Sequence, residues 1–426
     1  MLIEAPAAVV EITQVLEAAG HQAWCVGGAV RDALLGIPNL DWDFATSAKP
    51  QQVQRLFRRT VPVGIEFGTV GVLDETGVMH EVTTFRRDVE TDGRHAVVKF
   101  GASLDDDLAR RDFTINAIAY SPTRDELHDP FGGRDDLAAR IVRAVGVAKE
   151  RMREDRLRAL RAIRFASRFG FDIERATWQA IISSAPHLGR LSPERVRQEI
   201  EKTMKQVALP SHAFRMWKDS GALAALVPSL AGITSVELLA LDHLRLPILH
   251  GRPQRFITRL AALFASATPG TVVPTLKALR FSNSDVAWIG GLVERWHAMG
   301  RDMKEALMRP EPPTDAMLRQ WAGRAGRTRL APVLRLGDAF WWAERESGRQ
   351  APSRKRVESV YRRAVRIAYR DPVEVSDLAV NGDDLVALGI KGKRLGDALR
   401  GLLQVVLDDP TRNTRDFLLK YAERAA

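Results

Sequence analysis

The stretch CVGGAVRDALLGIPNLDWDFAT, residues 25–46, brings a glycine pair, an Arg-Asp step and an Asp-x-Asp motif into one short piece of chain. The pattern around the glycines predicts a strand followed by a helix that begins near Ala29. Because the first N–H groups of a helix lack intrahelical partners, Gly27 and Gly28 would accommodate a phosphate there, with Arg31 adding a charged contact. The alternative is that the glycines serve tight packing alone.

The Asp-x-Asp motif ends the same stretch, in DWDFAT (41–46). Asp41 and Asp43 are two residues apart, so on a strand their side chains would share one face. Two neighbouring carboxylates repel each other unless a cation joins them, and Mg²⁺ is a hard ion that binds one or two protein carboxylates together with substrate phosphates. The motif therefore predicts a Mg²⁺ site, and its alternative is a polar turn that leads into the next helix.

The composition bounds the class of protein. The chain has 426 residues, and its 63 Lys and Arg against 53 Asp and Glu give a net charge of +10, which favours polyanionic partners. This length predicts two to four compact units. The single cysteine, Cys25, excludes a disulfide framework and a multi-cysteine zinc site. Residues 1–20 do not resemble a signal or transit peptide, and no apolar run is long enough to span a membrane, so we expect a cytoplasmic protein without a membrane partner.

Strand and helix patterns are unevenly distributed along the chain. Up to about residue 145, runs with strand character alternate with helices, and from residue 149 onward apolar residues recur at the spacing of helices. The predicted strands lie in residues 22–27, 41–46, 67–74, 79–86 and 115–122. The fold class expected from this pattern is α+β, with a small mixed sheet followed by an all-helical remainder.

Several blocks together resemble a known family. GGAVRD (27–32) and LDWDFAT (40–46) are similar to the active-site signature of class II nucleotidyltransferases of the DNA polymerase beta superfamily, which include tRNA CCA-adding enzymes and bacterial poly(A) polymerases. The resemblance continues in order through RRDFTINAIAY (110–120), DPFGGRDDL (129–137), EDRLRALRAIRFASRFGF (154–171) and LSPERVRQEIEK (191–202). It implies a nucleotidyltransferase head in residues 1–148, a helical neck for base recognition in 149–210, a helical RNA-binding body in 211–374 and a helical tRNA-binding tail in 375–426.

The resemblance assigns the metal chemistry to carboxylates. Asp41 and Asp43 would be catalytic and would hold two Mg²⁺ ions, one of which activates the RNA 3′-hydroxyl while the other neutralises the triphosphate. Glu81, in the predicted strand HEVTTFR (80–86), is the expected third catalytic carboxylate. The alternative for Glu81 is a solvated glutamate on the face of a strand.

The nucleotide-binding residues implied by the resemblance come from three blocks. An arginine fork suits phosphate oxygens and a carboxylate accepts hydrogen bonds from sugar hydroxyls, so Arg111 and Asp112 would hold triphosphate and ribose. Asn116 would either bind substrate or steady the strand-helix corner. The full set is Gly27, Gly28, Arg31, Asp32, Arg111, Asp112, Asn116, Asp155, Arg158, Arg161 and Arg164.

Base selection without a template would depend on Asp155 and Arg158. Three residues apart on a helix, they are neighbours on one face and present an acceptor beside donors. Cytosine and adenine both show an amino donor next to a ring-nitrogen acceptor. Uracil and guanine show the opposite pattern and would leave buried polar groups unpaired.

Two further sets of charges flank this pair. Arg161 and Arg164 continue the series into the nucleotide pocket, although the spacing drifts by roughly 60° per step, so the arginines do not all serve one contact. Their alternative is exposed charge. Arg195 and Glu199, four residues apart, would brace the recognition helix or form a surface ion pair.

The end of the chain favours one activity within the class. VNGDDLVALGIKGKRLGDALRGLLQVVLDD (380–409) resembles the C-terminal domain of bacterial CCA-adding enzymes, and residues 86–114 resemble their flexible loop. The expected reaction is Mg²⁺-dependent, template-independent addition of CCA to the tRNA 3′ end from CTP and ATP, with release of pyrophosphate. The alternatives are an A-adding enzyme, a bacterial poly(A) polymerase and a non-catalytic RNA-binding protein.

Arginine-rich stretches in the helical half are expected to contact the RNA backbone. These stretches are residues 251–260, 319–337 and 353–370. A solvated surface is the alternative for any single arginine, and recognition of an RNA helix by its shape needs few base contacts.

Overall fold

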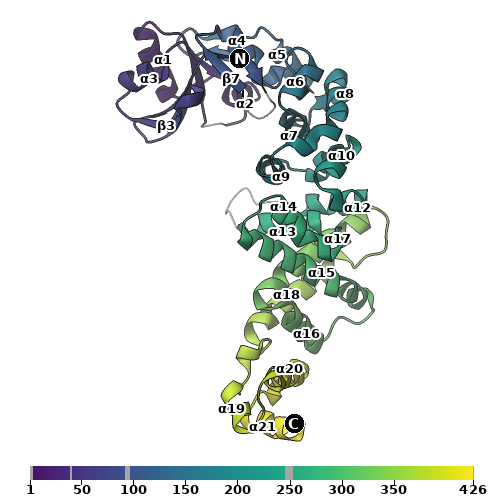
Figure 1. The fold of residues 1–426 in the computed structure, drawn as a ribbon. Helices are drawn as coiled ribbons and strands as arrows, with labels where there is room; N and C mark the ends of the chain where they lie inside the picture. The colour runs from purple at the N-terminus through teal and green to yellow at the C-terminus, as the bar shows by residue number, and fades with distance from the viewer. Residues whose placement is uncertain (1–2, 39–40, 92–95, 245–252, 426) are drawn as a thin grey trace. The chain divides into compact units, whose positions relative to one another are not determined.

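The structure of the chain is a computed structural model that describes residues 3–38, 41–91, 96–244 and 253–425 (Figure 1). The chain forms two compact units. One consists of Met1–Val207 with Met216–Leu226, and the other of Ala208–Arg215 with Val227–Ala426. The finer division into head, neck, body and tail stays a prediction.

A mixed sheet of seven strands organises the first unit, in the order β3-β4-β5-β2-β1-β8-β9. Its strands are β1 (Ala23–Val26), β2 (Asp43–Thr46), β3 (Thr60–Gly64), β4 (Thr69–Leu73), β5 (Met79–Thr84), β8 (Ala119–Ser121) and β9 (Glu126–His128). Strands β2 and β5 pair in parallel, and the other neighbouring strands pair antiparallel. The expected α+β class with a small mixed sheet is confirmed.

The centre of the sheet is built from short apolar strands. Every residue of β1 is buried, and Val26 at its end lies opposite Asp43 of β2. Helices α1 (Ala7–Ala18) and α2 (Gly28–Leu34) pack against β1, and a continuous apolar run suits a strand that is covered in this way. The register therefore places the turn that follows β1, at Gly27, near the first residue of β2.

Two predicted strands begin later than the sequence pattern indicates. Asp41 is exposed and precedes β2, which begins at Asp43, so the two carboxylates are not on one strand. Residues 114–116 form a 3₁₀ helix before β8, where the pattern predicts a strand from residue 115. Residues 39–40 of the opening motif lie outside the described residues.

The segment between β5 and β8 holds a separate hairpin. Strands β6 (Arg86–Thr91) and β7 (Ala96–Phe100) pair antiparallel, and helix α4 (Leu104–Ala109) follows them. Residues 86–114, which resemble a flexible loop, therefore contain regular elements in their described part. Residues 92–95 of this segment lie outside that part.

Helices follow the sheet in the first unit. Helix α3 (Pro50–Leu56) connects β2 to β3. The helices of this unit that come after β9 are α5 (Gly133–Ala139), α6 (Ala148–Glu154), α7 (Leu157–Phe169), α8 (Arg175–Ser184), α9 (Pro193–Gln206) and α11 (Ala222–Leu226). Helix α10 (Pro210–Asp219) belongs partly to each unit. Strands β10 (Ile141–Val142) and β11 (Asp172–Ile173) pair in parallel, so the predicted neck contains one short strand besides its helices.

Helix α7 is strongly amphipathic and supplies core residues as predicted. Leu157, Leu160 and Ile163 are buried. The sequence analysis places Asp155 and Arg158 on one helix, but α6 ends at Glu154 and α7 begins at Leu157. The Asp155 carboxylate accepts a hydrogen bond from the N–H of Leu157 at 3.0 Å, and such local side-chain bonds compete with a continuous helix.

The described part of the second unit is built from helices. They are α12 (Ser235–His243), α13 (Pro253–Phe264), α14 (Pro269–Ala278), α15 (Asn283–Met308), α16 (Asp315–Ala325), α17 (Arg327–Glu346), α18 (Arg354–Arg370), α19 (Gly382–Ala387), α20 (Lys393–Asp408) and α21 (Arg415–Ala425). Of the helices within the described ranges, none is long and apolar enough to cross a membrane.

Two arginines from the stretches expected to contact RNA are instead buried. Arg319 is 8% exposed and donates from Nε to the carbonyl of Leu407 at 2.7 Å, at the end of α20. A cation there is favourable because the carbonyl end of a helix is negative. Arg259 is 2% exposed and donates to the carbonyl of Leu241. These two arginines hold the fold together, and residues 251–252 of the first stretch lie outside the described residues.

Candidate active site

A turn at Gly27 joins β1 to α2 at the centre of the candidate site. Gly27 has a φ of +75°, in the left-handed region that favours glycine. A Cβ atom at this position would lie 2.8 Å from Nη1 of Arg111, so the guanidinium occupies the space beside the turn. Nε of Arg111 is buried and has no hydrogen-bond partner among the described residues. The structure thus brings Arg111 to the Gly27–Gly28 turn, although the two are far apart in the sequence.

Three carboxylates interact electrostatically at the start of β2. Asp43 is its first residue, and Glu81 lies on the neighbouring parallel strand β5. Burial raises the pKa of Asp43 to about 7, and the negative charges of Asp41 and Glu81 add to this rise, while Arg111 opposes it. A carboxylate among like charges favours a bound proton or a bound cation. This donor set therefore fits a divalent cation.

The described residues do not form a larger metal cluster. Within residues 3–38, 41–91, 96–244 and 253–425, no group of three or more His, Cys, Asp or Glu side chains is arranged to hold a metal ion. The assignment of Asp41 and Asp43 as metal ligands stays a prediction. Glu81 acts on Asp43 through its charge.

Arg31 is buried and connects α2 to other elements. Its guanidinium donates to Asp32 Oδ1 at 2.6 Å and to Asn116 Oδ1 at 2.5 Å. It also lies over the rings of Phe165 and Phe169 on α7, 5.1 and 4.7 Å from their centroids. The guanidinium of Arg31 is thus held by groups inside the protein, and it connects α2 to Asn116 and to α7. Its phosphate contact stays a prediction.

Asp32 and Asp112 both join the sheet region to α7. Asp32 accepts from Arg168 at 3.2 Å. Asp112 accepts from Asn116 at 2.8 Å and from Arg161 at 2.7 Å. Burial alone would raise the pKa of Asp112, but Arg161 and the hydrogen bond from Asn116 bring the pKa below its ordinary value. Asp112 is therefore a carboxylate at neutral pH, and Asn116 steadies the corner by bonding to it.

The predicted pair for base selection is not formed on one helix. Asp155 lies between α6 and α7, and its Oδ2 accepts from Arg195 at 2.7 Å. Arg158, in the first turn of α7, donates instead to Glu154 Oε2 at 2.7 Å. The expectation that both residues lie within one helix is wrong, because Asp155 has an extended backbone and its side chain bonds to the N–H of Leu157, where α7 begins. The role of the pair in base selection stays a prediction.

Helix α9 braces α7 through buried charge. Arg164 donates from Nε to Glu199 Oε2 at 2.7 Å, and their side chains are 4% and 1% exposed. Arg195 bonds to Asp155 rather than to Glu199. Both residues thus connect α9 to α7 or to Asp155 just before it, which agrees with the bracing alternative. The alternative of a surface ion pair is wrong for Glu199, because its carboxylate is buried against Arg164.

Sequence reasoning missed the aromatic part of this site. Phe165 and Phe169 on α7 are stacked with ring centroids 6.1 Å apart. Arg164 lies over the first ring and Arg168 over the second, in addition to Arg31. The four-residue spacing of the phenylalanines signals one helix face, but no pattern in the sequence identifies their partner on α2.

The chain is similar to known proteins along almost its whole length. Residues 23–143 match the poly A polymerase head domain, and residues 170–233 match the probable RNA and SrmB-binding site of polymerase A. The CCA-adding enzyme of Geobacillus kaustophilus is 35% identical over 410 residues, covering 95% of this chain and 93% of that protein. The CCA-adding enzyme of Latilactobacillus sakei is 36% identical over 417 residues, covering 97% of this chain and 96% of that protein.

Solved structures share the fold. The crystal structure of the Bacillus stearothermophilus CCA-adding enzyme in complex with CTP has a TM-score of 0.75 at 34% identity, covering 98% of this chain and 96% of that chain. A Thermotoga maritima CCA-adding enzyme complexed with tRNA has a TM-score of 0.67 at 22% identity, over 98% of this chain and 94% of that chain, and shows likeness of fold. With relatives above 30% identity aligned along nearly the full length, the chain belongs to the family of CCA-adding enzymes, which are tRNA nucleotidyltransferases.

Proposed function

We propose that this chain adds C, C and A to the 3′ end of tRNA from CTP and ATP and releases pyrophosphate. The observation that carries the proposal is the electrostatic cluster of Asp43 with Asp41 and Glu81 next to the Arg111 guanidinium at the Gly27 turn. A negative site for a cation thus lies beside a positive site for phosphate. The relatives aligned along the full chain carry the same activity in their names.

Magnesium is the metal that we assign to this site. Enzymes of this family generally need a divalent metal ion. Asp41 and Asp43 would hold Mg²⁺, since a hard cation offsets both the burial and the repulsion by Asp41 and Glu81 that raise the pKa of Asp43. When bound, the ion supplies positive charge for the RNA 3′-hydroxyl and the triphosphate. The third catalytic carboxylate, Glu81, would keep the negative potential high at Asp43.

The triphosphate would be held at the turn. The lack of side chains at Gly27 and Gly28 lets the guanidinium of Arg111 lie against the turn, and its Nε–H, which no described residue accepts, would bind a phosphate oxygen. Arg31 would contribute positive charge from behind the turn. Asp32 and Asp112 would fix the arginines of α7. Ribose hydroxyls would bind to Asp112 by replacing some of the hydrogen bonds that its two oxygens now accept from Phe113, Asn116 and Arg161.

For base selection, we propose that Asp155 and Arg158 exchange their present hydrogen-bond partners for the base of the nucleotide. Asp155 and Arg158 now bond to Arg195 and Glu154, and a cytosine or adenine edge would replace these contacts. Arg161 and Arg164 would hold the pocket in place from the next turns of α7. Asp155→Ala combined with Arg158→Ala should relax nucleotide choice more than it slows transfer, and equal exclusion of UTP and GTP by the variant would contradict this role.

The remaining parts of the proposal concern organisation. Residues 1–148 would act as the catalytic head, 149–210 as the neck, 211–374 as the RNA-binding body and 375–426 as the tRNA-binding tail. A cytoplasmic location agrees with the single, free and buried Cys25 and with tRNA as the substrate.

The test is incubation with tRNA that lacks its 3′ CCA, Mg²⁺ and labelled nucleotides. CTP alone should add two residues, and CTP with ATP should add three and then stop. Addition only of A to tRNA that already ends in CC would identify an A-adding enzyme. Long tracts from ATP alone would identify a poly(A) polymerase, and no incorporation would identify an RNA-binding protein without activity.

A further inference from the structure

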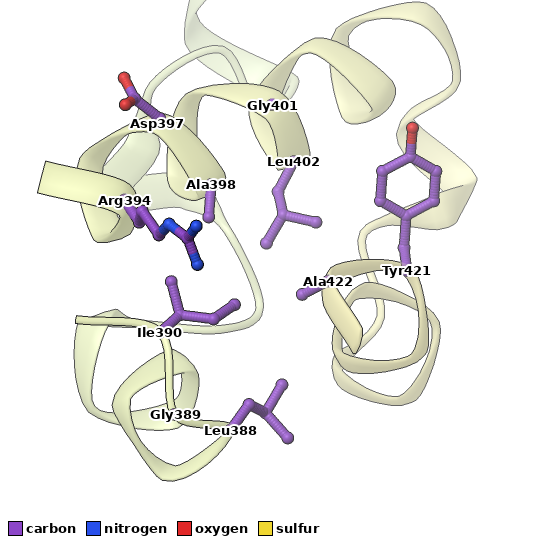
Figure 2. A pocket seen from close by; sticks show the side chains of 10 residues that line it. All are labelled: Leu388, Gly389, Ile390, Arg394, Asp397, Ala398, Gly401, Leu402, Tyr421 and Ala422. Atoms are coloured by element: carbon purple, nitrogen blue, oxygen red, sulfur yellow. The ribbon is translucent and has the colours of Figure 1, made fainter. Parts of the chain in front are cut away.

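A cavity in the tail has no role in the proposed reaction. It has a volume of about 540 Å³ and lies between the hairpin that joins α19 to α20 and the last helix, α21 (Figure 2). Its residues belong to the second unit, whereas the candidate active site is in the first. Ligand pockets for small organic groups are commonly of about 300–1,000 Å³, so the cavity is large enough for one nucleotide.

The floor of the cavity is apolar and one wall is aromatic. Ile390, Leu402 and Ala422 are 7%, 2% and 3% exposed and belong to a core cluster of the tail. Figure 2 shows the ring of Tyr421 on α21 facing the cavity side opposite Ile390. The Tyr421 side chain is 42% exposed and its ring is stacked with that of Phe417, which is 37% exposed. The ring of Tyr421 thus remains accessible at the cavity, and Phe417 stacks on it without being a lining residue.

Three cations without partners lie at or just before the start of α20. Lys391, Lys393 and Arg394 form no hydrogen bond or ion pair with any residue in the described part of the chain, and all three are exposed. Three other cations of the tail have acidic partners: Arg400 pairs with Asp397, Arg412 with Asp409 and Arg415 with Asp384. In Figure 2 the guanidinium of Arg394 points into the cavity, whereas the carboxylate of Asp397 points away from it. We call Arg394 and its unpaired neighbours in the sequence, Lys391 and Lys393, the positive edge; of these three residues, Arg394 lines the cavity.

The positive edge includes the start of a helix, where positive charge is unfavourable. Lys393 and Arg394 are the first two residues of α20, whose first turn has no acidic residue. The start of a helix carries partial positive charge, so cations there lower its stability unless an anion is close. Gly389 and Gly392 bound the hairpin at φ of +82° and +61°, and a Cβ at either would meet nothing within 4 Å. The backbone is accordingly open to a ligand at this point.

We propose that this cavity binds one unpaired nucleotide of the RNA substrate. The base would enter between Ile390 and Tyr421, and its phosphate would lie at Lys391, Lys393 and Arg394. Unstacked bases in RNA loops are commonly held on aromatic side chains, with basic residues along the backbone. An apolar floor, an accessible ring and three unpaired cations match these two requirements together. The inference rests on the proposed function, since tRNA is the RNA in question.

The first experiment measures binding of tRNA lacking CCA to the full chain by fluorescence anisotropy at fixed salt. Tyr421→Ala and Arg394→Glu should each weaken binding at least fivefold and raise KM for tRNA, with kcat at saturating tRNA unchanged. The matched controls are Lys420→Glu, an exposed cation on α21 outside the cavity, and Tyr369→Ala, an aromatic on α18 that is 58% exposed. Both should weaken binding less than threefold, and equal losses in the controls and the cavity variants would overturn the proposal.

A second experiment identifies the occupant. The full chain carrying the photo-crosslinking residue p-benzoylphenylalanine in place of Tyr421 is irradiated with tRNA, and the modified nucleotide is mapped by reverse transcription. Crosslinking to one unpaired nucleotide supports the site. Crosslinks confined to paired stems, no crosslink, or a crosslink abolished by free CTP or ATP would overturn it. Incorporation by the wild-type chain reports on the proposed function separately, so a failure of either idea is recognisable.

Discussion

The negative charge of Asp43 is unfavourable because the side chain is largely buried and lies near Asp41 and Glu81. Removing this charge should stabilise the metal-free protein. The perturbation is Asp43→Asn, which keeps the size of the side chain and removes its charge. The pKa of Asp43 is raised from 3.8 to about 7, and each pH unit of that rise corresponds to about 1.4 kcal/mol. The rise of roughly three pH units gives about 4 kcal/mol, which we halve to about 2 kcal/mol because water screens a partly exposed carboxylate.

The sign of the effect depends on pH. Because the folded-state pKa lies above the unfolded-state value, the Asp43 charge lowers stability increasingly as the pH rises from about 4 to about 7. The variant should therefore gain about 2 kcal/mol at pH 8 and less than about 1 kcal/mol at pH 5. In a unit of roughly 200 residues, a gain of about 2 kcal/mol raises Tm by about 4–8 °C.

The assay is calorimetric unfolding of both proteins in EDTA at pH 5 and pH 8. Glu75→Gln is the matched control, because Glu75 is an exposed carboxylate in the turn between β4 and β5. Added Mg²⁺ should raise the Tm of the wild type and leave Asp43→Asn unchanged. A variant that is no more stable than the wild type at pH 8, or no different from the control, would refute the reasoning.

Gly27→Ala should raise KM for CTP and ATP about tenfold, since its new Cβ collides with the neighbouring guanidinium and disturbs phosphate binding. Gly20→Ala is the control, because Gly20 has a similar φ of +80° with nothing within 4 Å, so both variants lose about 1 kcal/mol of stability and only the first loses affinity. Glu199→Ala should cost about 3–5 kcal/mol by leaving Arg164 buried and unpaired, lowering Tm in a thermal melt. Glu201→Ala, with a half-buried carboxylate on the same helix, should cost about 1 kcal/mol or less, and equal Tm values for the two glutamate variants would contradict the bracing role.

Local pattern predicted the turn and five of the seven strands of the sheet, but it missed β3 and β9. The apolar run before Gly27 forms a buried strand because helices cover it, and Asp43 is close to the turn because the register of β1 and β2 places it there. The spacing Asp-x-Asp predicts that the two carboxylates are close together, but it does not determine where the strand begins. Asp41 precedes β2, and its charge still acts on Asp43.

Contacts between distant parts of the chain could not be predicted. Arg31 is buried because Asn116 and two rings of α7 surround its guanidinium, and no local pattern reveals partners so far along the chain. Arg259 and Arg319 look like surface charge in the sequence, yet each bonds to backbone carbonyls inside the second unit. The break between α6 and α7 involves a hydrogen bond from the N–H of Leu157 to the Asp155 carboxylate. The spacing of apolar residues gives no sign of this bond.

Binding of Mn²⁺, followed by electron paramagnetic resonance with and without CTP, most directly tests whether the two aspartates hold a divalent ion next to the nucleotide. The wild type should remove Mn²⁺ from solution, more strongly with CTP present, and Asp41→Asn and Asp43→Asn should each lose this uptake while remaining folded. Unchanged uptake in both variants would contradict the central claim.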